Sequence, residues 1–455
     1  MKSTYQYRFY PDTHQKLELN QWLRISRYWY NRQLGDRFDW WEMNRTWLNA
    51  CPLVSSISEV REQPNYYSQK ALLPGLKKSS VKVEWSGEDL DLKRVDSTVL
   101  QNVCKKVDDA FKRFLAGDVN GKRSGKPRFK SESSYRTLTF ATSNNDWIKS
   151  ETARWLYIRL PKIGEIKVRK HRDLPECEIK QISLTKKVDG WTIQIMLEDL
   201  EQADIEVNDI PTWDNSLGLD AVLNEGIFLA TSEGDNLPSL KPLRNSQAKL
   251  DQISRKRNAA QRKSKSRRKL AKREAKQHQR IARSRKDFHY KTAHKIVKTG
   301  KTFIFHEKLN LAGLSRRNQT KQDETGTFLP NGQSAKSGLN KSWMDAGFGQ
   351  FFTLLGNIAS KAGSVLQSVN PAYTSQLLSY RNEVIFTDCS IRSYWDEQYS
   401  LSVDRDVNAA INVKRVGLDI FPTIKRRKSG IAIVDKSDRD LTKEILAILA
   451  KKPTL

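Results

Sequence analysis

Two acidic residues and an amide open a short apolar run near the end of this 455-residue chain. Asp404, Asp406 and Asn408 lead into residues 409–413, which are small or aliphatic and favour a helix. One interpretation is a helix cap, because carboxylates accept hydrogen bonds from the unpaired N–H groups of a first turn. The other is one corner of a metal site, which requires carboxylates from other elements to converge on the same cation.

Two further carboxylates lie in apolar runs that are typical of buried strands. Asp220 interrupts residues 217–223, and Glu307 lies towards the end of residues 302–309. Acids are rarely buried unless they are paired or bind a metal, and α/β folds gather their sites at strand ends. Phosphodiester hydrolysis at neutral pH needs an activated water and a neutralised leaving oxygen, which two Mg²⁺ ions held by carboxylates supply. Asp220, Glu307 and either Asp404 or Asp406 are therefore the candidate ligands.

Length and composition restrict the class of protein. The length predicts roughly three domains, and a hydrophobic content of 38% is enough to build their cores. Lys and Arg number 80 against 52 Asp and Glu, and the resulting net charge of +28 attracts polyanions. Nucleic acid is the first candidate partner, and a membrane surface is the second.

Membrane insertion and secretion are not expected. No stretch holds the roughly 18 uninterrupted apolar residues of a spanning helix, and residues 1–8 lack the apolar core of a signal peptide. We therefore expect a cytoplasmic protein without a membrane partner. The four cysteines, Cys51, Cys104, Cys177 and Cys389, form no C-x-x-C pair, so neither a disulfide framework nor a cysteine zinc site is predicted.

The first half of the chain predicts a β-domain interrupted by helices. Residues 1–10 alternate as a strand, and Thr13 is the expected cap of a helix that continues to about residue 50. The aromatic stripe of that helix is either core or a surface for stacking bases. Residues 97–115 predict an amphipathic helix, and residues 136–210 predict an antiparallel domain, a small barrel that strand 1–10 would join.

Two basic stretches are candidate nucleic-acid contacts, or else solvated surface. The first is the glycine-rich segment 121–130, with Lys126, Arg128 and Lys130. The second is residues 245–298, which we expect to form one long helix or a hairpin broken near residues 264–266. Its candidate contacts are Arg267, Arg268, Lys272, Arg273, Arg285 and Lys286.

The remaining segments surround the acids. Residues 315–342 are polar and glycine-rich and predict a loop, followed by a helix over 343–361. Residues 364–369 predict a strand and residues 384–387 a shorter one. A basic segment from about residue 425 precedes an amphipathic stretch over 441–449.

At the acids the sequence resembles a known family, the transposon-encoded TnpB proteins, which are related to type V CRISPR effectors. Its three nuclease motifs are matched by Gly218-Leu219-Asp220 with Ala230-Thr231-Ser232, by residues 305–310 (FHEKLN), and by residues 404–412 (DRDVNAAIN). Further similarity lies at residues 7–11, 125–130, 285–289 and 371–376, so the resemblance covers nearly the whole chain.

The resemblance implies an α+β multidomain fold and an RNA-guided DNA endonuclease of a bacterial insertion sequence. A β-barrel wedge domain would comprise residues 1–10 and 136–210, with a helical recognition domain at 11–135. An RNase H-like, RuvC-type nuclease domain would occupy 211–455. The partners would be guide RNA and a double-stranded DNA target, and the protein would associate with the nucleoid when bound.

Carried over by motif, the metal ligands are Asp220, Glu307 and Asp406, and two Mg²⁺ ions are expected. Asp406 precedes Asn408 by two residues, as the family's aspartate precedes its asparagine. Asp404 would then be a cap or an acid supporting the ligands, with Asn408 beside it.

Three departures from the family pattern stand out. Val222 replaces a usual glycine, and Lys308 follows Glu307 where a second acid is common. Four cysteines of a zinc module are expected within residues 370–403, but only Cys389 is present. We therefore predict no zinc and a degenerate module held by aromatic packing of Tyr380, Phe386, Tyr394 and Trp395.

These features are compatible with three functions. The leading hypothesis is an RNA-guided, Mg²⁺-dependent DNA endonuclease. The intact Asp220, Glu307 and Asp406 favour it. The second is a guide-dependent DNA-binding protein with impaired cleavage, acting as a repressor or transposition accessory, which Val222 and Lys308 leave open. The third is a basic RNA-binding or chaperone protein whose carboxylates are structural.

Overall fold

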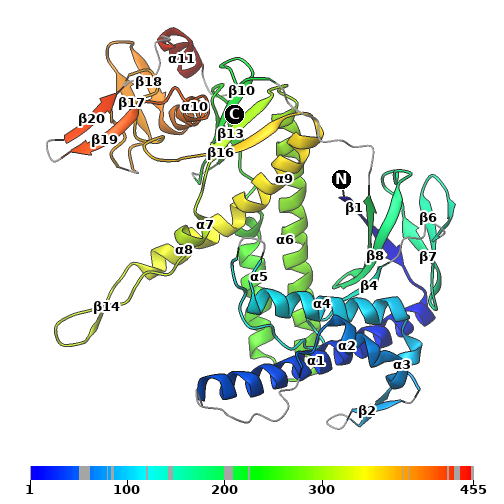
Figure 1. Cartoon of the computed structure of the whole chain (residues 1–455). Coiled ribbons are helices and arrows are strands. Elements are labelled where there is room, and N and C mark those ends of the chain that lie inside the picture. Colours follow the sequence, from blue (N-terminus) through cyan, green and yellow to red (C-terminus); the bar gives the residue numbers. More distant parts are fainter. Residues whose placement is uncertain are drawn as a thin grey trace. The chain divides into compact units, whose positions relative to one another are not determined.

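The chain forms two compact units, Met1–Ala203 and Asp204–Leu455, in a computed structural model (Figure 1). The structure describes residues 2–50, 62–78, 80–83, 87–118, 121–141, 147–198, 209–223, 226–381, 383–388, 390–427, 430–434 and 441–451. The predictions for Cys51 and Cys389 lie outside these residues. Among the described helices, none is long and apolar enough to cross a membrane.

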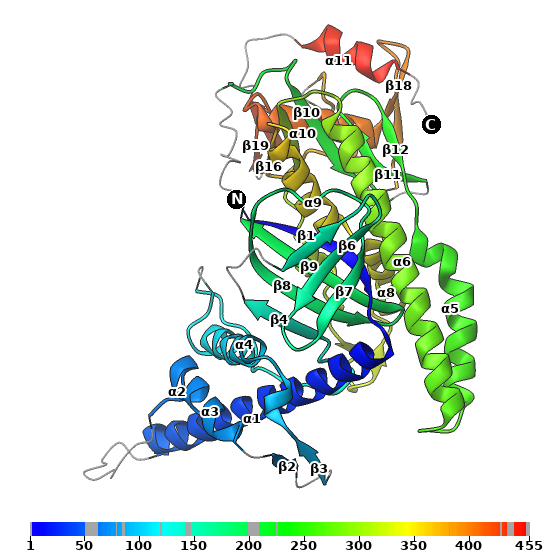
Figure 2. The same cartoon turned by 90° about the vertical axis from the view of Figure 1, so that its right-hand side faces the viewer.

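The first unit is built on a seven-stranded antiparallel sheet with the order β4-β8-β9-β1-β7-β6-β5 (Figure 2). Alternation along β1 buries Tyr7 and Phe9, which pair across the ladders with Ile193 and Val168. The first strand of the chain therefore lies in the middle of the sheet. The strands are β1 (Lys2–Tyr10), β4 (Thr137–Ala141), β5 (Ile148–Glu151), β6 (Trp155–Leu160), β7 (Gly164–Arg169), β8 (Glu178–Lys187) and β9 (Gly190–Glu198).

Helices occupy the segment between β1 and β4. The long helix α1 begins at Thr13, and the N–H of Gln15 donates to Asp12 Oδ1 over 2.7 Å, so Asp12 caps the helix and the prediction of Thr13 was wrong. Trp22 and Trp29 of its aromatic stripe are fully buried, as the core interpretation predicts. The elements are α1 (Thr13–Ala50), α2 (Tyr66–Ala71), α3 (Leu73–Leu76), β2 (Val81–Val83), β3 (Glu88–Leu90), η1 (Leu92–Arg94) and α4 (Ser97–Leu115).

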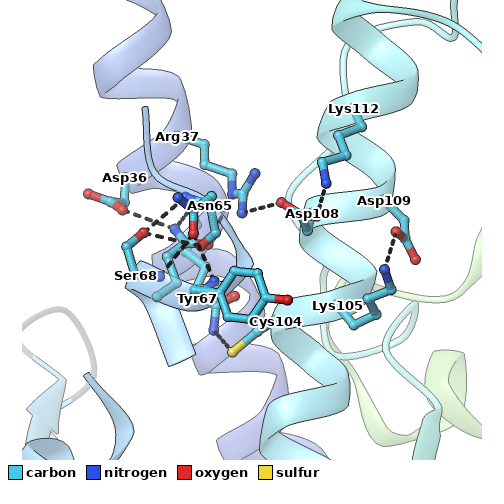
Figure 3. A network of polar contacts seen from close by, with 12 residues as sticks. Asp36, Arg37, Asn65, Tyr67, Ser68, Cys104, Lys105, Asp108, Asp109 and Lys112 are labelled. Atoms are coloured by element: carbon cyan, nitrogen blue, oxygen red, sulfur yellow. Dashed lines mark hydrogen bonds and ion pairs between the residues drawn. The ribbon is translucent and has the colours of Figure 1, made fainter. Parts of the chain in front are cut away.

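A buried polar network ties α1, α2 and α4 together (Figure 3). Arg37 on α1 donates to Asp108 on α4 and to Gln69 on α2, each over 2.9 Å, and Lys112 pairs with the second oxygen of Asp108. The side chains of Arg37 and Asp108 are both 1% exposed. The burial of this acid is thus matched by two cations, which keeps the three helices in one arrangement.

The second unit contains a five-stranded sheet with the order β12-β11-β10-β13-β16. β10, β13 and β16 run parallel, whereas β11 and β12 continue the sheet antiparallel, beginning with the β10–β11 hairpin. The strands are β10 (Ser216–Ala221), β11 (Ile227–Thr231), β12 (Asn236–Pro238), β13 (Phe303–Glu307) and β16 (Val365–Val369).

The basic segment forms the hairpin alternative, with α5 (Pro242–Ala259) and α6 (Lys265–Val297) separated at Ser264, which caps α6. Arg267 closes this turn, because its guanidinium donates to the carbonyls of Arg257 and Ala260. α6 ends against α9 (Phe348–Lys361), where His289 and Phe348 both stack on Phe228 of β11.

The loop predicted for residues 315–342 was partly wrong. α8 (Gln333–Ala346) already covers its second half, and Gly347, with φ of +65°, separates α8 from α9. The predicted strand at 384–387 is reduced to one bridge between Val384 and Leu377. The remaining elements are α7 (Leu311–Leu314), β14 (Lys321–Gln322), β15 (Phe328–Leu329), β17 (Ser393–Asp396), β18 (Leu401–Asp404), α10 (Arg405–Gly417), β19 (Thr423–Arg427), β20 (Gly430–Val434) and α11 (Thr442–Leu449).

Candidate active site

The pairing of β10 with β13 brings the first two acids together. Leu219 lies opposite His306 in this parallel ladder, so Asp220 and Glu307 follow at equivalent positions on neighbouring strands. Neighbouring strands are about 4.8 Å apart, and side chains at equivalent positions share a face. Both acids therefore lie at the carboxyl ends of their strands, on the same face of the sheet.

The same face is covered by α10, which carries the third acid. Gly218 and Phe305 precede the two acids by two residues and share their face. A Cβ on Gly218 would overlap the carbonyl oxygen of Ala410, and one on Gly417 would overlap the ring of Phe305. These two glycines let α10 approach the strands so closely that its first turn, with Asp406, lies towards Asp220.

The N-terminus of α10 shows how its two acids differ. Asp404 is the cap, because its Oδ1 accepts hydrogen bonds from the N–H groups of Asp406 and Val407 over 2.8 and 3.0 Å. Asp406 is 6% exposed and lies in the first turn. Asn408 is fully buried and bonds the backbone of Leu377 and Ser379, so its contacts hold the preceding loop.

The acids act on one another electrostatically. Burial raises the pKa of Asp220 well above its ordinary value, and the negative charges of Glu307 and Asp406 raise it further. Burial also raises the pKa of Glu307, against a hydrogen bond from Thr374 that lowers it. The pKa of Asp404 is raised, first by burial. A buried acid whose pKa is raised by neighbouring acids marks a site in which a cation would stabilise the ionised form.

Asp406 is engaged by two arginines. Its Oδ1 lies 3.1 Å from Arg405 Nη2 and 3.4 Å from Arg392 Nη1, and the Arg392 side chain is 46% exposed. Within the described part of the chain, no group of three or more His, Cys, Asp or Glu side chains is placed to hold a metal ion. The three acids suit Mg²⁺ in donor type and charge, but their side chains are not arranged as one metal site in this structure. Asp406 has arginine partners that a cation would have to replace.

Two departures from the family pattern have simple structural outcomes. Val222 is 4% exposed and packs in a cluster with Trp213 and Leu378 beyond the end of β10. Lys308 is exposed, and its N–H continues the ladder by donating to Val369 O over 2.9 Å. Neither side chain is buried between the acids.

The cysteine-poor segment is held by a polar contact as well as by rings. Asp396, 1% exposed, pairs with Arg381 over 2.9 Å and accepts a hydrogen bond from Tyr380 Oη. Tyr380 and Phe386 are buried as predicted, but Trp395 is 59% exposed, so its predicted packing role was wrong. The ion pair was missed because Arg381 and Asp396 are distant in sequence and meet only through the β17–β18 hairpin.

The predicted nucleic-acid contacts divide into engaged and exposed cations. Arg267 closes the α5–α6 turn, and Arg285 donates to Asp345, which is itself buried and caps α5. Lys126 pairs with Glu42 over 3.1 Å, and Lys130 lies over the ring of Tyr30. The exposed set comprises Arg128, Arg268, Lys272, Arg273 and Lys286.

A basic cavity in the first unit was not predicted. It has a volume of about 820 Å³ and lies among α1, the segment before β4 and the β8–β9 turn. Its cations come from residues far apart in sequence, so no local charge run marks it. They are Arg24, Arg27, Arg136, Lys186 and Lys187.

Comparisons with known proteins place these features in a family. Residues 202–318, which contain Asp220 and Glu307, match a family described as a probable transposase of the OrfB/IS605 type. Residues 348–413, which contain Asp406, match the Cas12f1-like TNB domain. Residues 1–46 match a helix-turn-helix domain, although here they form β1 and one continuous helix. Two of the three matched models are thus named for OrfB of IS605, and one of these is described as a probable transposase.

Two relatives match over most of their lengths. The putative RNA-guided DNA endonuclease InsQ of Escherichia coli (strain K12) is 26% identical over 392 residues, 85% of this chain and 91% of the relative. A putative RNA-guided DNA endonuclease of Streptomyces pristinaespiralis is 24% identical over 92% of this chain and 90% of its own. Together, these family models and relatives support the assignment of the chain to the TnpB family.

Solved structures of effector complexes are similar over much of the chain. The Cas12f1–sgRNA–target DNA complex is 13% identical with a TM-score of 0.32, covering 92% of this chain and all of that one. A CRISPR–Cas12f ternary complex is 13% identical with a TM-score of 0.28, covering 88% of this chain and 82% of that one.

Proposed function

We propose that this protein is an RNA-guided DNA endonuclease of a bacterial insertion sequence that hydrolyses phosphodiester bonds with Mg²⁺. The observation that carries the proposal is the convergence of Asp220, Glu307 and Asp406 at one end of a parallel sheet and the helix covering it. The relatives that match most of the chain are both named as putative RNA-guided DNA endonucleases, which supports the same activity.

The second unit is, in this proposal, an RNase H-like domain of the RuvC type, extending over residues 211–455. Its strand order, with an antiparallel pair beside three parallel strands, supports this assignment. The sheet of β1 and residues 136–210 is the proposed barrel-shaped wedge domain, and residues 11–135 are the proposed recognition domain inserted into it. The segment 370–403 is a degenerate module for which we propose no zinc.

Asp220, Glu307 and Asp406 would hold the Mg²⁺ ions, two in number. Bound there, Mg²⁺ would supply charge neutralisation and an activated water for attack on a phosphodiester. The chain's own contribution is positional: the β10–β13 register fixes two acids, and α10 carries the third. Asp404 and the first-turn N–H groups hold the start of that helix in place, while Arg405 and Arg392 balance the charge of Asp406.

Guide RNA and a double-stranded DNA target are the proposed partners. Exposed cations on α6 suit a phosphate backbone: Arg268 and Lys272 lie one turn apart on the helix, and Arg273 follows Lys272. The basic cavity around Arg24 and Arg27 supplies a second such surface in the first unit. A protein of this kind would work at the bacterial nucleoid.

The test uses the purified protein with the RNA that co-purifies with it, a library of DNA targets and Mg²⁺. We expect cleavage of a sequence complementary to that RNA, loss of cleavage in Asp220→Ala, and retained target binding by that variant. Asp251→Ala on the exposed face of α5 is a matched control that should cleave normally. Cleavage that survives Asp220→Ala would show that the metal assignment is wrong.

A guide-dependent DNA-binding protein without cleavage is the alternative, and it is not favoured. All three acids are present, and neither Val222 nor Lys308 disturbs the elements that carry them. The same experiment separates the two, since sequence-selective binding without any cleavage by the wild-type protein would establish the alternative.

A further inference from the structure

Glu307 has a buried partner that no nuclease motif of the sequence includes. Thr374, in the turn after β16, is completely buried, and its Oγ1 lies 2.6 Å from Glu307 Oε1. The same hydroxyl lies 3.0 Å from Pro371 O. A hydroxyl has one proton, and the shorter, charge-assisted bond to the carboxylate is the stronger of the two.

The local backbone directs this hydroxyl inwards. Asn370 Oδ1 accepts a hydrogen bond from the N–H of Ala372 over 3.1 Å, which starts the turn. Tyr373 then adopts φ of +65°, a left-handed conformation that residues other than glycine rarely take. Such a conformation persists only where its surroundings fix it, and here it returns the chain towards the end of β13.

The surroundings that fix this turn come from α10. Asn412 is fully buried, and its Nδ2 donates to Thr374 O over 2.9 Å and to Leu377 O over 2.7 Å. Asn408, one helical turn earlier, donates to the same Leu377 carbonyl and accepts from Ser379 N–H. Two amides on one face of the helix therefore hold the backbone of residues 374–379.

We propose that Thr374 is a positioning residue that orients Glu307 for metal binding, and that Asn412 keeps Thr374 in place. α10 thus carries one acid, Asp406, and orients another, Glu307, through a hydrogen-bond relay from Asn412 to Thr374. The inference rests on the proposed function, because it assigns Glu307 a metal. It explains the second asparagine of the DRDVNAAIN segment, which contacts none of the three acids in the described residues.

A merely structural threonine would behave differently from a positioning one. Thr374→Val keeps the branched shape and volume but removes the hydroxyl, whereas Thr374→Ser keeps the hydroxyl and loses a methyl group. The neighbouring Ser375→Ala is a matched control, because the Ser375 hydroxyl takes part in no hydrogen bond among the described residues. If packing alone mattered, Val would be the milder change and Ser the more damaging one.

The experiment measures two quantities for each variant. The first is the cleavage rate at saturating target as a function of Mg²⁺ concentration. The second is the rise in unfolding temperature of the RNA-free protein on titration with Mn²⁺, which reports metal binding without catalysis. Loss of a partner that orients a metal ligand costs roughly 10–100-fold in metal affinity or activity, and we expect this for Thr374→Val in both readouts. Thr374→Ser and Ser375→Ala should stay within a few-fold of wild type.

The outcomes separate this inference from the proposed function. If the wild type cleaves and Thr374→Val matches it in both readouts, the positioning role is wrong while the nuclease stands. The positioning role is equally wrong if Thr374→Ser is as impaired as Thr374→Val. If no variant cleaves but Mn²⁺ binding depends on Asp220 and on the Thr374 hydroxyl, the positioning stands and the nuclease proposal fails. If the wild type neither cleaves nor binds Mn²⁺, both are overturned.

Discussion

Two buried aspartates, one in each unit, have opposite electrostatic surroundings. Burial pushes the pKa of Asp108 upwards, but hydrogen bonds and charges from Lys112 and Arg37 outweigh it, so the net shift is downwards (Figure 3). Burial raises the pKa of Asp220 too, and there the nearest charges, those of Glu307 and Asp406, raise it further, against a weaker opposing effect from Arg405. Cations of the protein itself therefore neutralise Asp108, whereas Asp220 lies among other acids.

This difference separates a structural acid from a candidate catalytic one. A buried ion pair with a satisfied network fixes the arrangement of helices and has no need of an external partner. A cluster of buried acids destabilises the protein that contains it unless a proton or a cation neutralises it. Strongly perturbed carboxyl groups are therefore a marker of function, and the second unit contains them where two strands end.

The largest expected effect is that of Asp220→Asn. Cleavage should fall by more than the roughly 10–100-fold that loss of a supporting partner causes, while the metal-free second unit should become more stable at neutral pH. A carboxyl whose pKa is raised on folding adds stability below its unfolded pKa, and this stability is lost as pH rises through the folded pKa. The Asp220→Asn variant has no carboxyl group to ionise here, so its second unit should not lose this stability as pH rises. Calorimetry in EDTA from mildly acidic to mildly alkaline pH would detect the difference.

The control for this variant is Asp251→Asn, which removes an exposed charge from α5. It should leave both cleavage and the pH dependence of unfolding unchanged. Equal pH dependence in wild type and Asp220→Asn would contradict the contrast between the two aspartates.

The corresponding test in the first unit is Arg37→Met, which removes a cation that pairs with the buried Asp108. Removing one partner of a buried ion pair costs about 3–5 kcal/mol, and we expect the lower end because Lys112 still pairs with Asp108. Adding Asp108→Leu should recover most of this loss, since an apolar pair of similar volume avoids burying a charge. Denaturant unfolding of the two variants checks the prediction, and a double variant as unstable as the single one would contradict it.

The contrast between charged groups that are paired within the protein and those that are not extends to cations, for which we expect smaller effects of substitution. Replacing Arg268, Lys272 and Arg273 together by Ala should weaken RNA binding. The slope of the log binding constant against log salt concentration should also become shallower, by roughly 0.7–0.9 for each phosphate that is no longer neutralised. Arg285→Ala, whose guanidinium is bound to Asp345, should lower stability and leave that salt slope unchanged. Binding measured across a salt series, with unfolding as the second readout, distinguishes exposed from engaged cations.

The smallest effect is expected at the site itself, for Arg392→Gln. Arg392 is the exposed partner of this pair, and ion pairs screened by solvent contribute about 0.2–1 kcal/mol. Releasing this partner of Asp406 should therefore lower the Mg²⁺ concentration for half-maximal cleavage only a few-fold. Lys361→Gln at the end of α9 removes another exposed charge and should have no effect. A higher Mg²⁺ requirement in Arg392→Gln would mean that this arginine supports metal binding.

Much of the fold was predictable because the informative patterns are local. The alternation over residues 1–10, the amphipathic stripe of α4 and the apolar runs around Asp220 and Glu307 all gave elements with nearly the observed bounds. The Asp404 cap was one of the two interpretations of its segment, and the structure contains it. In each case the chain neighbours of a residue determine its conformation.

What could not be predicted depends on contacts between distant segments. Arg405 and Arg285 look like solvated cations in the sequence, yet acids brought near by folding engage them. Thr374 is one of many hydroxyls in turns, and only the β13–β16 pairing places it beside Glu307. α8 was missed because its polar, glycine-containing sequence favours a loop unless packing at Asp345 and Trp343 selects a helix.

The position of β1 has a consequence for synthesis of the protein. This strand leaves the ribosome before α1 and α4, yet both of its neighbours, β7 and β9, are translated after those helices. The helices can pack on one another while the sheet still lacks its middle, so assembly of the first unit waits for β9. A ribosome that stops before β9 releases a chain in which residues 2–9 of β1 lack this neighbour, with the side chains of Tyr7 and Phe9 left without their cover. We expect such fragments to aggregate or be degraded.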